Sequence, residues 1–191
     1  MSKEEARAKE ELRNHFADLR LNLSSEECRR KSNQIRKRVI ETAEFRRSKT
    51  VHTYISMPHK KEVDTFGIIE YMLQAGKNVV VPKMAGDGEL DHIHLRSLDQ
   101  LEQNAWGVQE PQSGKVVSVQ EPNLVLVPMV AGDSEKNRLG YGKGYYDRFL
   151  SESSAVKMGL LYEIQLSKVK IPVEPFDISL DILVTEKRRI D

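Results

Sequence analysis

The sequence predicts an α/β protein in which a mostly parallel sheet carries helices on both faces, a Rossmann-like three-layer arrangement. Two observations lead to this fold class. Short apolar runs such as LVLVP at 124–128 have the length and composition of buried strands. Between these runs lie segments whose apolar residues recur at helical spacing, and such alternation builds parallel sheets. The 191 residues contain no repeat or long linker, so we expect a single domain over 1–191.

Four helices are predicted from apolar spacing and capping residues. Leu12, Phe16 and Leu19 share one face of the first, and Ser24 is a candidate N-cap for the second. Cys28 falls on the apolar face of the second helix, so we interpret it as a small buried hydrophobe rather than a nucleophile. The expected helices cover about 3–21, 25–44, 65–76 and 145–150.

Six strands are predicted between these helices. The alternating run LDHIHL at 90–95 indicates a half-buried strand at an edge of the sheet, whereas the other five runs are short and apolar. Sheets of this class bind ligands at the carboxyl ends of their strands, so we expect the site at that edge. The expected strands are 51–55, 78–82, 90–95, 124–128, 157–161 and 182–184.

The most informative segment is RLGYGKGYYDR at 138–148, which follows the apolar run 124–128 and opens the fourth helix. Its three alternating glycines let backbone N–H groups approach a ligand, and the helix N-terminus together with Arg138, Lys143 and Arg148 favours an anion. The spacing matches neither the P-loop nor the dinucleotide-binding fingerprint. We predict a phosphate-binding loop; the alternative is a flexible strand-to-helix connection.

Two further basic clusters lie near the N-terminus. Lys9, Arg13 and Arg20 form a stripe that borders the apolar face of the first helix, from which side chains can reach a ligand, although we expect Arg20 to be solvated. The second helix carries RRK at 29–31 and RKR at 36–38, which we interpret as an exposed basic face rather than an RNA-binding surface.

Composition excludes several classes of protein. Thirty basic and 29 acidic residues give a net charge of +1, so there is no global electrostatic case for nucleic acid. No run of 18 apolar residues suggests a membrane span, and the charged first 15 residues do not resemble a signal peptide. With a single cysteine the chain suits a reducing cytoplasm. We expect small-molecule partners, and a monomer in preference to an oligomer.

Metal ligands are harder to identify from spacing. Asp147, Asp177 and Asp181 are candidates for Mg²⁺, which usually takes one or two protein carboxylates together with phosphate oxygens and water. The alternatives are a helix cap for Asp147 and a turn for Asp177. His92 and His94 share one strand face, but no third ligand lies near them in the sequence, which disfavours zinc.

The chain resembles the 5-formyltetrahydrofolate cyclo-ligase family, also called 5,10-methenyltetrahydrofolate synthetase. NRLGYGKGYYDR at 137–148 is similar to the signature loop of that family. Phe176 departs from the histidine that many members have, and PMVAGD at 128–133 replaces Pro-Gly-x-Ala-Phe-Asp. Four weaker matches occur in the expected order: KEELR at 9–13, EVDT at 62–65, WGVQEP at 106–111 and the acidic segment 172–181.

The resemblance implies ATP-dependent closure of 5-formyltetrahydrofolate to 5,10-methenyltetrahydrofolate, with Mg²⁺ as cofactor. It assigns Asp147 and Asp177 to magnesium. ATP would be held by Lys9, Arg13, Arg138, Leu139, Gly140, Tyr141, Gly142, Lys143, Gly144, Tyr145 and Tyr146. The folate would contact Ile55, Glu62, Tyr141, Gly142, Lys143, Gly144 and Tyr145.

Phosphorylation of the formyl oxygen depends on positioning and charge neutralisation, so no covalent nucleophile is required. We therefore expect Arg138 and Lys143 to stabilise the transferring phosphoryl group. Tyr145 or Trp106 would stack on the pterin, although Trp106 is equally well explained by core packing. The alternatives are a non-catalytic relative that binds nucleotide, folate or RNA, and a sugar-phosphate enzyme on a similar fold.

Overall fold

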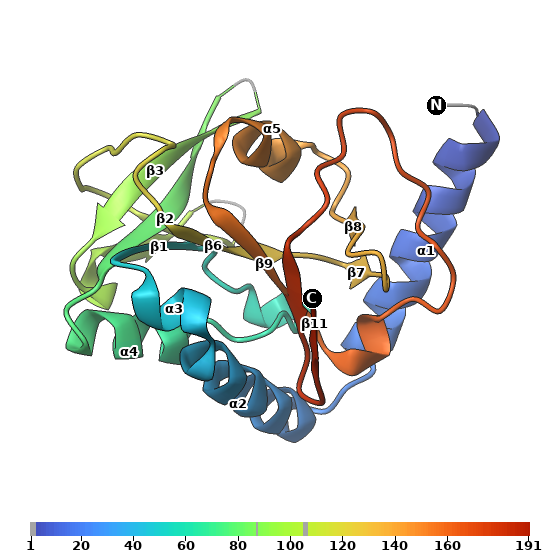
Figure 1. Ribbon diagram of the computed structural model, residues 1–191, viewed down its shortest axis with the longest axis horizontal. Coiled ribbons are helices and arrows are strands. Elements are labelled where there is room, and N and C mark those ends of the chain that lie inside the picture. The colour runs from blue at the N-terminus through green and yellow to red at the C-terminus, as the bar shows by residue number, and fades with distance from the viewer. Residues whose placement is uncertain (1–2, 87, 105–106) are drawn as a thin grey trace.

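Five parallel strands form the centre of the protein, which a computed structural model describes over residues 3–86, 88–104 and 107–191 (Figure 1). The seven-stranded sheet has the order β11-β10-β9-β6-β1-β2-β3, and only its two edge strands, β3 and β11, run antiparallel to their neighbours. The strands of this sheet are β1 (Thr50–Thr53), β2 (Asn78–Ala85), β3 (Glu89–Leu95), β6 (Leu124–Pro128), β9 (Val156–Leu160), β10 (Ile182–Val184) and β11 (Arg189–Ile190).

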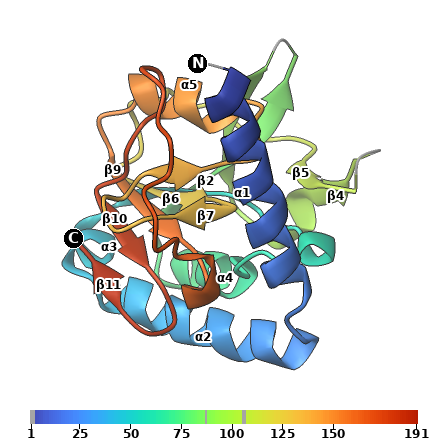
Figure 2. The same ribbon diagram turned by 90° about the vertical axis from the view of Figure 1, so that its right-hand side faces the viewer.

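Helices cover both faces of the sheet, as the sequence predicts. In Figures 1 and 2, α2, α3 and α4 lie on one side of the strands and α5 on the other, while α1 runs along the end of the sheet at which the glycine loop lies. The helices are α1 (Lys3–Leu21), α2 (Ser25–Glu41), α3 (Ala43–Arg47), α4 (Phe66–Gln74) and α5 (Tyr145–Glu152), with short 3-10 turns at Pro58–Lys60, Leu98–Gln100 and Glu163–Gln165.

The pleat of β6 explains why this strand is apolar throughout. Leu124 and Leu126 pack into the core beneath α2 and α4, whereas Val125 and Val127 face the cluster that contains Phe149 of α5. All four are fully buried. A strand buried on both faces has no solvent side on which to place polar residues, so it appears in the sequence as a continuous apolar run.

Most predicted elements are confirmed, and two strands have the predicted bounds, 124–128 and 182–184. The second helix, however, ends at Glu41 rather than near residue 44. Thr42 adopts extended backbone, with φ −67° and ψ 147°, and its side chain accepts a hydrogen bond from the amide of Phe45, so that it caps a separate helix α3. Five short strands are not predicted from the sequence: β4 (Leu101–Gln103), β5 (Gln109–Pro111), β7 (Ala131–Gly132), β8 (Arg138–Leu139) and β11.

The basic face of α2 is not fully exposed, and the prediction is wrong at Lys31. This side chain is buried, and its ammonium group donates to the carboxylate of Glu186. Arg29, Arg30 and Lys37 are exposed as expected. Lys31 lies where α2 packs against β10. Its ammonium charge is therefore paired with the carboxylate of Glu186, which follows β10, instead of being solvated.

A buried histidine pair on β1 and β3 leads to a prediction about stability. His52 is fully buried, its Nε2 lies 3.3 Å from Nδ1 of His92, and both rings pack against Phe149. Burial holds the pKa of both imidazoles below the ordinary 6.5, and the neighbouring His92 lowers the pKa of His52 further. The unfolded chain therefore takes up protons below about pH 6.5 that the folded chain does not.

We accordingly expect the free energy of unfolding to be fully retained above about pH 6.5 and to fall as the pH is lowered towards the folded pKa values. The slope should approach about 1.4 kcal/mol per pH unit for each histidine. Urea unfolding between pH 7.5 and 5.5 measures it, and His52→Gln should make the slope shallower. An identical slope in that variant would contradict the assignment to His52.

Candidate active site

A cavity of about 700 Å³ opens at the carboxyl ends of β1 and β6. β1 and β6 are neighbours in the sheet, whereas β2, the strand that follows β1 in the sequence, lies on the other side of β1. The order of the sheet therefore reverses between β1 and β6. Tyr54 and Ile55 continue β1 into the wall, Pro128 ends β6 there, and the glycine loop and α1 close the other side. The site thus lies where the predicted fold class places it.

The β7–β8 hairpin delivers the glycine loop to this cavity. Ala131 and Gly132 pair with Leu139 and Arg138, and the chain then turns through residues 140–144 into α5. Gly142 and Gly144 have φ of 85° and 71°, a region that side chains disfavour. Gly144 is the N-cap of α5 and provides no side-chain cap, so the first amides of the helix are left for a ligand at the cavity.

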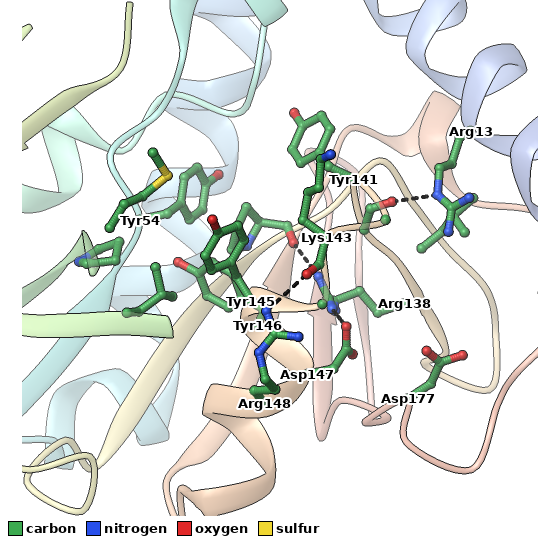
Figure 3. A pocket seen from close by; sticks show the side chains of 18 of the residues that line it. Arg13, Tyr54, Arg138, Tyr141, Lys143, Tyr145, Tyr146, Asp147, Arg148 and Asp177 are labelled. Carbon is green, nitrogen blue, oxygen red and sulfur yellow. Dashed lines mark hydrogen bonds and ion pairs between the residues drawn. The ribbon is translucent and has the colours of Figure 1, made fainter. Parts of the chain in front are cut away.

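Arg138 is held almost buried beside the first turn of α5, with its side chain 6% exposed. One Nη2–H donates to Oδ2 of Asp147 over 2.7 Å, as drawn in Figure 3. Within the described part of the chain its Nε–H is buried and has no hydrogen-bond partner. A buried unpaired donor costs about 1–3 kcal/mol, so this group indicates a place for an acceptor that a ligand supplies.

Glu62 is 7% exposed, and both of its carboxylate oxygens are engaged. The amide of Met57 donates to Oε2 over 2.8 Å, and the hydroxyl of Tyr141 donates to Oε1 over 2.5 Å. Burial, and then the Glu62 charge, raise the pKa of Tyr141 above the ordinary 10.0, so this hydroxyl stays protonated and donates. Glu62 thereby ties the loop after β1 to the glycine loop.

The expectation that Arg20 is solvated is wrong. It is only 2% exposed, and its guanidinium donates to the hydroxyl of Tyr141 over 2.8 Å and to the carbonyl of Met129 over 3.2 Å. The other two members of the stripe do line the cavity. Lys9 bridges Glu174 and Asp177 at 3.0 and 2.5 Å, which anchors the 172–177 segment to α1.

Further side chains complete the wall. Arg13 donates to the carbonyl of Gly140 over 3.0 Å (Figure 3). Tyr146 also lines the cavity, and its hydroxyl is buried without a partner among the described residues. Burial raises the pKa of Tyr146, which keeps this hydroxyl available as a donor. The guanidinium of Arg148 lies over the ring of Tyr145, with its Cζ 5.6 Å from the centroid of that ring.

Every residue that the family resemblance assigns to ATP, the folate or magnesium lines this one cavity, whereas Trp106 lies outside the described residues. The residues brought together are Lys9, Arg13, Ile55, Glu62, Arg138, Leu139, Gly140, Tyr141, Gly142, Lys143, Gly144, Tyr145, Tyr146, Asp147 and Asp177. The cavity is also lined by three residues to which the sequence assigns no role, Met57, Glu110 and Glu174. Glu110 and Glu174 stand in segments that resemble family motifs, whereas Met57 contributes its backbone amide, which no side-chain pattern signals.

The candidate metal ligands differ in their surroundings. Asp147 and Asp177 both line the cavity, each with Oδ2 in an ion pair, whereas the carboxylate of Asp181 accepts from the amide of Lys157 outside the cavity. In the described residues no group of three or more His, Cys, Asp or Glu side chains forms a preassembled metal site. Nor does any described helix have the length and apolarity needed to cross a membrane.

Comparison with known proteins identifies the family of the chain. The model of the 5-formyltetrahydrofolate cyclo-ligase family matches residues 5–186. The chain belongs to this family. It is 35% identical over 170 residues to the probable 5-formyltetrahydrofolate cyclo-ligase of Schizosaccharomyces pombe. This alignment covers 81% of this chain and 83% of the relative. The Haemophilus influenzae cyclo-ligase is 29% identical over 92% of this chain and 97% of its own.

Solved structures of cyclo-ligases have the same architecture. The 5,10-methenyltetrahydrofolate synthetase of Aquifex aeolicus superposes with a TM-score of 0.85 at 37% identity, and covers 95% of this chain and 91% of its own. Both departures from the family pattern are placed by the structure. Met129 is buried in the core and its carbonyl accepts a hydrogen bond from Arg20, while Phe176 lines the cavity and is 63% exposed.

Proposed function

We propose that this cyclo-ligase family member closes 5-formyltetrahydrofolate to 5,10-methenyltetrahydrofolate at the expense of ATP, releasing ADP and phosphate. The names of its relatives specify this substrate and this product. The observation that carries the ATP dependence is Arg138, an almost buried guanidinium beside the N-terminus of α5, whose Nε–H has no partner in the described part of the chain. A phosphate oxygen supplies the missing acceptor.

The cavity offers different chemistry to the two substrates. In the view of Figure 3, Arg13, Arg138 and Asp177 lie on one side, and Tyr54, Tyr145 and Tyr146 lie on the other. Cations and free helix amides suit a triphosphate. Aromatic and apolar side chains suit a flat pterin, and the Glu62 carboxylate suits its ring N–H groups.

The chemistry follows from the poor leaving ability of a formamide oxygen. The formyl oxygen attacks the γ-phosphorus, and the bond between this phosphorus and ADP breaks. N10 then attacks the activated formyl carbon and loses its proton, and the C–O bond breaks as phosphate departs with the oxygen. Arg138 and Lys143 neutralise charge on the transferred group, so the protein contributes positioning and electrostatics rather than a covalent nucleophile.

We further propose that Asp147 and Asp177 hold Mg²⁺ together with the ATP phosphates. The ion pairs with Arg138 and Lys9 engage Oδ2 of each carboxylate, so Oδ1 of each is the oxygen that a metal would take. From the described residues, Oδ1 of Asp147 accepts only a long 3.4 Å bond from the amide of Ile178. Two carboxylates fit a cation that takes its remaining ligands from phosphate and water. When bound, Mg²⁺ would supply charge neutralisation to the phosphate oxygens.

The decisive experiment is incubation of the purified protein with Mg-ATP and 5-formyltetrahydrofolate. We expect the absorbance of the methenyl product to appear together with one ADP per product, and to be absent without ATP or in the presence of EDTA. Because Asp147 is proposed as a ligand of Mg²⁺, the variant Asp147→Asn should need a higher Mg²⁺ concentration for half-maximal turnover in the same assay. Binding of both ligands without product would instead identify a non-catalytic relative, and turnover independent of ATP would indicate a sugar-phosphate type of chemistry.

Small molecules are the partners that this proposal requires. We keep the cytoplasm as its compartment, because a chain with a single cysteine, Cys28, is suited to a reducing environment. Fractionation of cells that express the protein from its own locus tests the compartment directly.

A further inference from the structure

Arg20 is a buried cation that touches the site without lining its cavity. It comes from the last turn of α1, and only 2% of the residue is exposed. One Nη donates to the carbonyl of Met129, which directly follows β6, and the other donates to the hydroxyl of Tyr141 in the glycine loop. The guanidinium therefore joins α1 to two segments that form the active site.

The hydrogen bonds continue from Tyr141 into the folate side of the cavity. The Tyr141 hydroxyl donates to Oε1 of Glu62 over 2.5 Å, and Oε2 of Glu62 accepts from the amide of Met57 over 2.8 Å. Arg20 and Glu62 are opposite charges, each less than a tenth exposed, linked through one neutral hydroxyl. A buried charge is costly unless it is paired or hydrogen-bonded, so the two ends of this chain support each other.

The donor-to-acceptor direction of these hydrogen bonds is fixed by the chemistry of Arg20 and Glu62, the two charged groups at the ends of the series. A guanidinium has only N–H donors, so the oxygen of Tyr141 must accept from Arg20. The single proton of the hydroxyl is then left to point at Glu62, whose ionised carboxylate has only acceptors. Without Arg20 the hydroxyl is free to rotate away, and Glu62 loses a donor whose direction is defined.

We propose that Arg20 is a positioning residue of the active site, which fixes the Tyr141 hydroxyl and through it holds the Glu62 carboxylate in one orientation towards the substrate. The contribution to turnover rests on the function proposed above, whereas the orientation of Glu62 does not. Arg20 belongs to neither of the proposed ligand sets, and its effect on Glu62 passes through Tyr141.

Kinetics separate this role from simple packing. Arg20→Met retains the length of the side chain but no donor, and Gln165 still donates to the carbonyl of Met129. In Arg20→Met and in Tyr141→Phe we expect the KM for 5-formyltetrahydrofolate to rise on the order of tenfold, the effect of one charge-assisted hydrogen bond. The KM for ATP should change less than about threefold. Arg20→Lys should recover part of the loss, because an ammonium group also donates.

The two substitutions interrupt the same chain, so Arg20→Met combined with Tyr141→Phe should cost no more than the worse single variant. Lys31→Met is the matched control, since it also removes a buried paired cation but lies outside the cavity. It should lower stability and leave both KM values unchanged. Additive losses in the double variant, or an equal change in both KM values, would show that Arg20 only supports packing.

A second measurement needs no substrate. Because the Met57 amide donates to Glu62, its hydrogen exchange reports how firmly the carboxylate is held. We expect this exchange to accelerate about tenfold or more in Arg20→Met and Tyr141→Phe, and not in Lys31→Met. Unchanged exchange in both variants overturns the proposal, whatever the activity. Faster exchange in a protein that never forms the methenyl product leaves the positioning intact and removes only the proposed function.

Discussion

Replacement of Lys143 by alanine is expected to lower kcat on the order of 10²- to 10³-fold while the KM for 5-formyltetrahydrofolate stays within about threefold. Lys143 lies in the glycine loop between Gly142 and Gly144, and its exposed side chain projects at the cavity (Figure 3). Among the described residues its ammonium group forms no ion pair, in contrast with Lys9 and Arg138. The Lys143 ammonium group can therefore bind a phosphate without first breaking an ion pair with the described residues. The negative charge that develops during phosphoryl transfer is stabilised most by such a cation.

Steady-state rates at saturating Mg-ATP, measured over a range of folate concentrations, separate the two parameters. Lys143→Arg should retain part of the activity because the charge remains. Lys168→Ala is the control, since Lys168 is an exposed lysine away from the cavity. A kcat close to that of the unaltered protein would exclude Lys143 from the transfer step, and a large rise in folate KM alone would place it on the folate instead.

The opposite signature is expected for Glu62→Gln, with a 10- to 100-fold rise in the KM for 5-formyltetrahydrofolate and a smaller effect on the KM for ATP. The Glu62 carboxylate accepts from the Met57 amide at one oxygen and from the Tyr141 hydroxyl at the other. Glutamine has the same shape but only one oxygen, so its NH₂ group must face one of these donors. The side chain then has to turn or leave a buried donor unpaired, which costs about 1–3 kcal/mol.

Glu186→Gln is a close match for this experiment. Glu186 is also 7% exposed and also accepts at both oxygens, from Lys31 and from the amide of Glu163, but it does not line the cavity. Both variants should lower the thermal midpoint, and only Glu62→Gln should weaken folate binding, measured by titration without ATP. An equal loss of folate affinity in the two variants would mean that stability, and not the site, accounts for the effect.

The predicted strands were accurate where burial leaves no choice of residue. β6 and β10 are buried on both faces, and the bounds predicted for them, 124–128 and 182–184, are those of the strands. The two-residue strands β7, β8 and β11 carry no such signal, because two residues cannot establish a period and their pairing depends on a distant partner. The β7–β8 hairpin matters for function, since it carries Arg138 to the cavity.

Site residues show the same division. Those from Arg138 to Asp147 belong to one continuous segment, whose glycines, cations and helix start are all visible in the order of the residues. Glu62 was found from its short family-like motif, but neither its bond to the Met57 amide nor its bond to Tyr141 has a sequence signature. Those bonds depend on how two loops approach each other.

The sequence by itself determined the α/β class, the glycine loop and the identity of the cations and acids that surround the cavity, because these depend on local spacing and on residue chemistry. Tertiary structure alone decided what each charge faces. Lys9, Arg13 and Arg20 occupy equivalent positions along one border of α1, yet Lys9 meets carboxylates, Arg13 meets a loop carbonyl and Arg20 is buried against Tyr141. The surroundings of a helix border are set by the segments that the fold brings against it, and these lie more than a hundred residues away in the chain.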